Sequence, residues 1–142
     1  MNELEILPTA EEMKALKAEV LRHEQFQPET QHFFADGMYM RVVPRPKSCL
    51  IFGKKHKKQH FYVVVKGKVT IVGEGKRTTV EAPAYFVCEP GTQRAVYAHE
   101  DSICLTVHRT DKTDLTEIDE DLVESDPDSP FLPGNVLKGL LK

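Results

Sequence analysis

The chain has 142 residues and a formal net charge of −3, with 40% hydrophobic and 29% charged residues. This balance excludes wholesale disorder, and no apolar run approaches the roughly 20 residues that span a bilayer. The first ten residues are acidic and lack the basic and apolar regions of a signal peptide. The three cysteines, Cys49, Cys88 and Cys104, form no C-x-x-C pair, so we expect a reduced, cytoplasmic protein with no membrane partner.

Charge is strongly segregated along the chain. Residues 41–77 carry eleven Lys/Arg and one Glu, a net +10, whereas residues 111–128 carry nine Asp/Glu and one Lys, a net −8. The two blocks could attract each other within the chain or between copies, and either could meet an outside partner of opposite sign.

The N-terminal region predicts one helix over residues 9–24. Thr9 and Glu12 have the spacing of a capping box. Four apolar residues recur at helical spacing and predict a packed face: Met13, Leu16, Val20 and Leu21.

From residue 38 to 109 the pattern changes to short strands separated by turn residues, which predicts an all-β sandwich or barrel. The expected strands are 38–43, 47–53, 61–65, 68–72, 77–81, 84–88, 94–98 and 102–109. Residues 61–65 are apolar throughout, which is typical of a strand covered on both faces. The second cover would be the N-terminal helix or another subunit.

The C-terminal region loses this periodicity. Residues 110–130 are acidic and contain Pro127 and Pro130, which predicts an extended or mobile tail, and residues 131–142 predict a docking segment or short helix. The chain therefore divides into a helix with its connector (1–37), a β-barrel (38–109) and the tail with its docking segment (110–142).

Two segments resemble the motifs of the cupin superfamily: GKKHKKQHFYVVVKG at 53–67 and EPGTQRA at 89–95. The first cupin motif has two His separated by one residue, then a Glu, then a Gly; the second has Pro-x-Gly or a close variant followed by a His. The resemblance implies a small single-domain cupin-like double-stranded β-helix, a jelly-roll barrel, with an N-terminal helix and an acidic C-terminal tail. It also implies a dimer or higher homo-oligomer.

The metal positions of the motifs are degenerate in this chain. Counted back from Gly67, the family's Glu position is His60, the second His position is His56 and the first is Lys54, while the second-motif His position is Arg94. Only one of four positions therefore carries the family's residue.

A divalent transition metal on His56 and His60 is one interpretation of these residues. It needs a third ligand, for which His99 and His108 are candidates. On an ideal strand, residues four apart are separated by roughly 13 Å, so the two imidazoles would need a bulge or bend to share one ion.

A metal-free pocket for a small anion is the interpretation that we favour. Lys54 and Arg94 would repel a divalent cation but attract a carboxylate or phosphate. Tyr62 shares strand parity with His56 and His60, so all three would face the barrel interior. The five candidate ligand-binding residues are Lys54, His56, His60, Tyr62 and Arg94.

Three functions follow from these residues. The barrel could bind a small anionic molecule, act as a metal-dependent cupin enzyme (a dioxygenase, isomerase or lyase), or serve as an oligomeric scaffold. In a purely structural interpretation the imidazoles satisfy each other or the backbone, and Arg94 pairs with Glu81, Glu89 or the acidic tail. Net acidity and the lack of a nucleic-acid-binding motif argue against nucleic acid.

Overall fold

Two antiparallel β-sheets and two helices make up the computed structural model, which describes residues 10–22, 27–73, 76–129 and 131–137. The elements in chain order are α1 (Ala10–Leu21), β1 (Gln31–Ala35), β2 (Met38–Arg45), β3 (Leu50–Phe52), β4 (His60–Lys66), β5 (Lys68–Gly73), β6 (Lys76–Glu81), β7 (Ala84–Cys88), β8 (Arg94–Ala98), β9 (Ser102–Arg109), α2 (Leu115–Leu122), β10 (Phe131–Leu132), a 3-10 turn (Pro133–Asn135) and β11 (Val136–Leu137).

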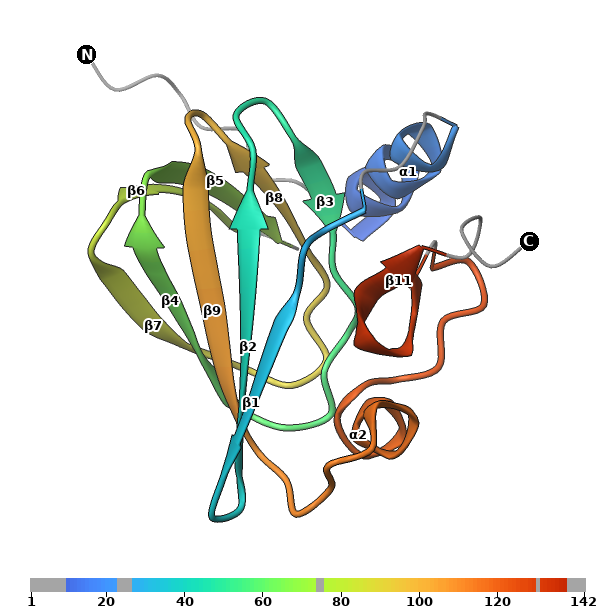
Figure 1. Cartoon of the computed structure of the whole chain (residues 1–142). Coiled ribbons are helices and arrows are strands. Elements are labelled where there is room, and N and C mark those ends of the chain that lie inside the picture. The colour runs from blue at the N-terminus through green and yellow to red at the C-terminus, as the bar shows by residue number, and fades with distance from the viewer. Residues whose placement is uncertain (1–9, 23–26, 74–75, 130, 138–142) are drawn as a thin grey trace.

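The strands form a jelly-roll of two sheets facing each other (Figure 1). One sheet has the order β1-β2-β9-β4-β7 and the other β3-β8-β5-β6, while β10 and β11 form a small separate hairpin. The all-β prediction is confirmed, and each of the eight predicted strands is present with bounds shifted by a few residues at most.

The main core lies between the two sheets. Val64 of β4 and Cys104 of β9 face Val69 and Val96 of the opposite sheet, and all four are buried. Along each strand, successive side chains point to opposite faces of the sheet, and each of these four residues is at an inward-facing position. Cys88 and Cys104 are buried free thiols, while Cys49 is only partly buried.

Three strands were absent from the sequence prediction: β1, and the short β10 and β11, which form a hairpin where a docking segment or short helix was expected. β1 pairs with β2 through a hairpin whose two turn residues, Asp36 and Gly37, have φ angles of 40° and 76°. Positive φ at both central positions is the type I′ arrangement that Asp-Gly favours, so the dipeptide was the available signal.

Helix α1 packs beside the barrel at β3 (Figure 1). Leu16 contacts the buried residues Phe52 and Ala95. Thr9 and the side chains of the other three predicted face residues lie outside the described residues. Since α1 is at β3, it does not supply the second cover proposed for strand 61–65. Within the part of the chain that the structure describes, no helix is long and apolar enough to cross a membrane.

The prediction of an extended or mobile tail is wrong for residues 115–122, which form α2. Asp114 caps the helix by accepting hydrogen bonds from the backbone N–H groups of Thr116 and Glu117 at 3.0 and 3.1 Å. Ile118 and Leu122 are buried on its inner face. The helix buries these apolar side chains against the barrel despite its acidic composition.

Candidate functional site

A cavity of about 100 Å³ lies inside the barrel between the two sheets. All five residues predicted to bind a ligand line it, so the structure brings them together. Its basic and polar lining residues are Arg41, Arg45, Lys54, His56, His60, Tyr62, Thr92, Arg94, Thr106 and Asn135. Its apolar lining includes Val43, Ile51, Phe52, Val96 and Phe131. None of the described residues that line the cavity is an Asp or Glu.

Three imidazoles gather at the α2 end of the barrel. The ring centroids of His56 and His60 are 4.4 Å apart, and that of His108 lies 5.1 Å from the first and 4.7 Å from the second. Residues 53–59 form a bent loop, which supplies the bend that the two imidazoles need and removes the 13 Å separation of an ideal strand. His99, the other candidate third ligand, lies elsewhere and bonds the Thr70 hydroxyl.

The acidic C-terminal region holds this loop in place. The Lys57 backbone N–H donates to the Leu122 carbonyl at 2.7 Å, and the Glu124 N–H donates to the Lys55 carbonyl at 2.8 Å. His56 pairs with Val123 as an isolated antiparallel bridge. The loop that carries His56 is therefore shaped by the segment that follows α2.

Burial keeps the histidine cluster neutral. Desolvation, helped by the neighbouring His60 and Arg41, lowers the pKa of His56 to about 3. Desolvation, again with Arg41 beside it, lowers the pKa of His108 to about 2. Burial likewise lowers the pKa of His60, although a hydrogen bond to the Lys58 backbone opposes the effect. At neutral pH all three rings are uncharged.

All three rings have a hydrogen-bonding group beside them, and for His56 this is the Lys54 backbone. His60 Nδ1 donates to the Lys58 carbonyl at 3.3 Å, and His108 Nε2 lies 2.8 Å from the Thr106 hydroxyl. His56 Nε2 is shielded from solvent and has no hydrogen-bond partner. The structural interpretation, in which the imidazoles satisfy one another or the backbone, therefore leaves one nitrogen unexplained.

A divalent metal does not fit this cluster. The His108 ring is nearly parallel to those of His56 and His60, with interplanar angles of 16° and 27°, so the rings stack by their faces. Among the described residues, no three His, Cys, Asp or Glu side chains are placed to hold a metal ion. Arg41 and Arg94 also lower the pKa of His56, which shows a positive potential that opposes any cation.

Three arginines give the cavity its charge, and none of them has an ion pair among the described residues. Arg41 Nε donates to the Tyr39 hydroxyl at 3.0 Å, and its guanidinium lies 5.4 Å from the centre of that ring. The structure shows no pairing of Arg94 with Glu81 or Glu89 within the same residues. Arg45 lies beside Tyr62 and the Cys104 thiol.

The Arg45 guanidinium and the Tyr62 hydroxyl are the unsatisfied groups of the cavity. Arg45 Nε and Nη1 and Tyr62 Oη are shielded from solvent and have no hydrogen-bond partner. The Cys104 thiol beside both residues is a weak hydrogen-bonding group and does not replace a polar oxygen acceptor. Burial raises the pKa of Tyr62, so the phenol stays protonated and can donate. Shielded donors without acceptors are costly in a folded protein.

Lys54 is the exception among the predicted cationic residues. It lines the cavity, but its ammonium group pairs with Asp119 of α2 at 3.2 Å. Lys58 pairs similarly with Asp121 at 3.0 Å, and Lys57 Nζ donates to the Glu120 carbonyl at 2.7 Å. The basic loop and the acidic helix thus meet within one chain, which is one of the three outcomes suggested by the charge segregation. The charge of Lys54 is therefore already compensated.

Sequence reasoning missed Arg41, Arg45 and Thr106 as cavity residues. Their signal was parity: Arg41, Val43 and Arg45 alternate with Met40, Val42 and Pro44 along β2, so the charged side chains share one face. That face was not assigned to the interior because charged residues more often point to solvent.

Comparison with known proteins identifies the fold and no closer relationship. No family model and no curated protein matches the chain. Several solved structures do match. KdgF from Halomonas sp. has 14% identity and a TM-score of 0.53, and the match covers 64% of this chain and 91% of that one. The Cnp3 cupin domain of Schizosaccharomyces pombe has 15% identity and a TM-score of 0.52, covering 68% and 71%.

A predicted oxalate decarboxylase from Thermotoga maritima is also similar, with 14% identity and a TM-score of 0.51, covering 58% of this chain and 80% of that one. The chain therefore has the cupin jelly-roll fold, as the two sequence motifs predicted. At such low identities the function has to be argued from the cavity itself.

Proposed function

We propose that the barrel binds a small organic anion, a carboxylate with a short apolar body, in its interior cavity. The observation that carries the proposal is the Arg45 guanidinium, whose Nε and Nη1 are shielded from solvent without a partner. A carboxylate in the cavity would accept charge-assisted hydrogen bonds from this guanidinium, which are stronger than those between neutral groups. The Tyr62 hydroxyl would donate a further hydrogen bond.

The rest of the cavity supports an anion. Arg41 and Arg94 add positive charge, and no described lining residue is acidic. In such a low-dielectric site each attraction is stronger than in water, so a bound anion would offset the cost of the buried arginine. Neutral imidazoles can donate or accept hydrogen bonds at the other end of the cavity, where His56 Nε2 lacks a partner.

Size and lining favour a short carboxylate. An apolar cavity of about 150 Å³ holds a benzene ring, so about 100 Å³ suits a ligand of roughly four or five non-hydrogen atoms. Val43, Ile51, Phe52 and Phe131 would contact a carbon body. Inorganic phosphate shares the charge but has no such body.

Binding fits this site better than acid–base catalysis. A general base works best with a pKa near the operating pH. Burial instead lowers the pKa of His56 to about 3 and that of His108 to about 2, so both are weak bases. The cavity is suited to holding an anion.

The test is a thermal-shift and calorimetric titration of the full chain with acetate, propionate, lactate and inorganic phosphate. At a carboxylate concentration of 100 Kd we expect a rise in Tm on the order of 10 °C, from about 2.7 kcal/mol of linkage. Arg45→Met should abolish the rise. The matched control is Arg77→Met on β6, an exposed arginine outside the cavity, which should leave it intact.

Two outcomes would contradict the proposal: no response to any of the four anions, or a response that Arg45→Met leaves unchanged. A response to phosphate alone would keep the anion site but overturn the carboxylate assignment.

A further inference from the structure

His56 Nε2 is a buried polar atom that the proposed carboxylate site does not use. It is shielded from solvent and has no hydrogen-bond partner among the described residues, like the two nitrogens of Arg45 and the Tyr62 hydroxyl. All three residues line the same cavity. Because buried polar groups in proteins are normally hydrogen-bonded, a complete ligand satisfies this nitrogen as well as the arginine.

The hydrogen bond at the other ring nitrogen determines what His56 Nε2 can do. Burial is the largest influence on the pKa of His56 and lowers it, while a hydrogen bond to the Lys54 backbone acts in the opposite direction. A bond raises the pKa of an imidazole when the ring donates to a carbonyl, because that bond favours the protonated ring. Since Nε2 has no partner, the donor is Nδ1. A neutral imidazole carries one proton, so Nε2 has a free lone pair and accepts.

The imidazole lies close enough to the carboxylate site for one small molecule to reach both. His60, whose ring centre is 4.4 Å from that of His56, lies two residues from Tyr62 on β4. Two residues of a strand span roughly 7 Å. Two hydrogen bonds of about 2.8 Å each take up much of this length. A carboxylate and a donor group separated by one or two carbon atoms therefore reach both ends.

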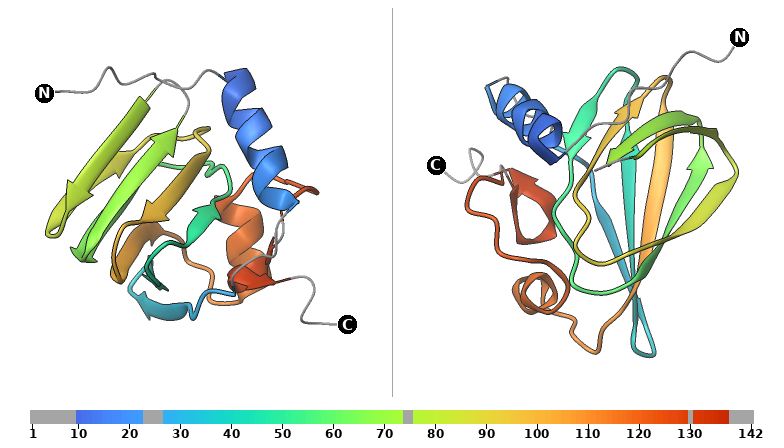
Figure 2. Two further views of the ribbon diagram at one scale, coloured as in Figure 1. Left: turned by 90° about the horizontal axis from the view of Figure 1, so that it is seen from above. Right: turned by 180° about the vertical axis from the view of Figure 1, so that it is seen from behind.

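The ring of His56 is held in place on both sides. Its backbone pairs with Val123 in the segment after α2, and Figure 2 shows α2 beside the loop that joins β3 to β4. Its ring stacks on His108 with an interplanar angle of 16°. A hydrogen-bonding group that is fixed in this way discriminates between ligands, because it does not turn to suit a different one.

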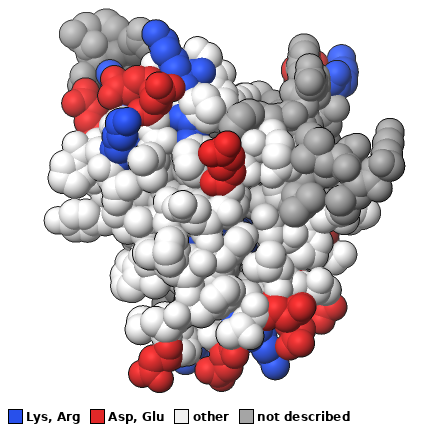
Figure 3. Space-filling model, in the orientation of Figure 1, with Lys and Arg blue, Asp and Glu red and all other residues white. Residues whose placement is uncertain are grey.

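The electrostatics of the cavity favour an uncharged donor. Besides burial and the neighbouring His60, Arg41 and Arg94 lower the pKa of His56, so the potential at the imidazole is positive and disfavours an ammonium group. In Figure 3 acidic side chains at this end of the molecule lie on the surface over α2, whereas no described residue that lines the cavity is acidic. A hydroxyl therefore suits the nitrogen better than an amino group.

We propose that the ligand is a short hydroxycarboxylic acid, whose hydroxyl donates to His56 Nε2 while its carboxylate binds Arg45. This ligand class rests on the proposed function and makes His56 a specificity-determining residue. The acid without a hydroxyl leaves the nitrogen unsatisfied, and the corresponding keto acid presents an acceptor oxygen to its lone pair, so both bind more weakly. An amino acid brings a cation into a positive site and is rejected.

The test is calorimetric titration of the full chain with a series of three-carbon acids: propionate, both enantiomers of lactate, 3-hydroxypropionate, pyruvate and alanine. We expect at least one hydroxy acid to bind about tenfold more tightly than propionate, the cost of leaving a buried acceptor unmade. Pyruvate should bind no better than propionate, and alanine should not bind.

His56→Phe keeps an aromatic ring in the stack but removes the acceptor. It should abolish the preference for the hydroxy acid while propionate still binds. The matched control is Gln59→Ala, an exposed position of the same loop outside the cavity, which should keep the preference. The ¹⁵N chemical shifts of the histidine rings test the acceptor without any variant, and His56 Nε2 should be unprotonated in the free protein.

The outcomes separate this inference from the proposed function. A protonated Nε2 would overturn the inference and leave the carboxylate site standing. Propionate or pyruvate binding as tightly as every hydroxy acid would do the same, because water would then satisfy the nitrogen, and so would a preference that His56→Phe retains. Failure of all the carboxylates to bind would overturn both proposals.

Discussion

The inner and outer faces of the five-stranded sheet have opposite chemistry, although alternate residues of the same strands make them. The inner face presents polar and charged side chains to the cavity: Arg41, Arg45, His60, Tyr62 and Thr106. The outer face presents aromatic and aliphatic side chains to the solvent: Phe33, Met40, Phe61, Val63 and Leu105. Away from the cavity the inner face carries the apolar core, which includes Val64 and Cys104, whereas the outer face of an antiparallel sheet is normally polar.

This inversion teaches that the two faces have different tasks. Polar groups inside a barrel cost stability unless something satisfies them, and apolar groups outside cost solubility unless something covers them. An anionic ligand would satisfy the first face, and the homo-oligomer expected from the sequence would cover the second. The proposed ligand and the expected oligomer rest on different residues and can fail independently.

The sharpest contrast between the faces is a pair of neighbouring substitutions on β2. Tyr39 is fully buried against Ile118 and Leu122 of α2, so Tyr39→Ala should lower the free energy of unfolding by about 3–5 kcal/mol. Met40→Ala removes a partly exposed side chain of the outer face and should cost under about 1 kcal/mol. Urea denaturation of both variants at one protein concentration measures the two losses; equal losses would contradict the contrast.

The inner histidine cluster predicts a loss of stability in acid. The folded-state pKa values of His56, His60 and His108 lie below the unfolded value of about 6.5, so the unfolded chain binds more protons as the pH falls. The free energy of unfolding should therefore decrease below pH 6.5, by about 2 kcal/mol at pH 5 for each ring that stays neutral.

Denaturation at pH 7 and pH 5 measures this decrease. His56→Gln should reduce it by about 2 kcal/mol, whereas Gln59→Ala, a non-titrating change in the same loop, should leave it intact. A decrease of the same size in both variants would show that the cluster does not cause it.

The unpartnered arginine predicts a gain in stability on its removal. Arg45→Met replaces shielded donors that have no acceptor with an apolar side chain of similar length, and the ligand-free protein should become about 1–2 kcal/mol more stable. Arg77→Met, at an exposed position on β6, should change stability by under about 0.5 kcal/mol. A destabilised Arg45→Met would mean that the guanidinium supports the barrel structurally.

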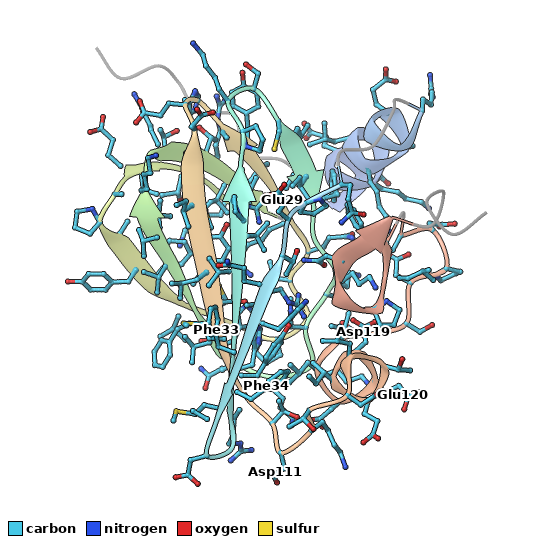
Figure 4. All side chains as sticks on the ribbon, in the orientation of Figure 1. Glu29, Phe33, Phe34, Asp111, Asp119 and Glu120 are labelled. Carbon is cyan, nitrogen blue, oxygen red and sulfur yellow. The ribbon has the colours of Figure 1, made fainter. Side chains whose placement is uncertain are left out.

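The smallest effect is expected at the contact between loop and helix. Lys54 and Asp119 are paired and mostly buried, with 15% and 22% of their side chains exposed, so Asp119→Asn should cost about 0.5–1 kcal/mol, less in high salt. Its neighbour Glu120 is exposed, and Glu120→Gln should cost nothing measurable. Figure 4 labels both residues on α2. Equal losses of stability in the two variants would show that the Lys54–Asp119 ion pair does not hold the loop in place.

Much of the fold could be read from the sequence, whereas the site could be read only in part. Strand bounds followed from residue type and turn signals, and the Lys66–Gly67 and Glu89–Gly91 segments marked the cupin motifs. Helix α2 was missed because nine acidic residues suggested disorder, although Leu115, Ile118 and Leu122 have helical spacing after the Asp114 cap. In this segment the acidic composition was given more weight than the helical spacing of the apolar residues.

The sequence by itself determined the strand pattern, the barrel, the segregation of charge and the five residues that reach the cavity, since side-chain alternation and turn chemistry are local properties of the chain. Tertiary structure alone decided which partners those residues have. The bend that brings His56 beside His60, the pairing of Lys54 with Asp119 and the isolation of Arg45 each depend on segments distant in sequence. Partners and shielding from water follow from three-dimensional packing, and these decide which charges remain free to bind.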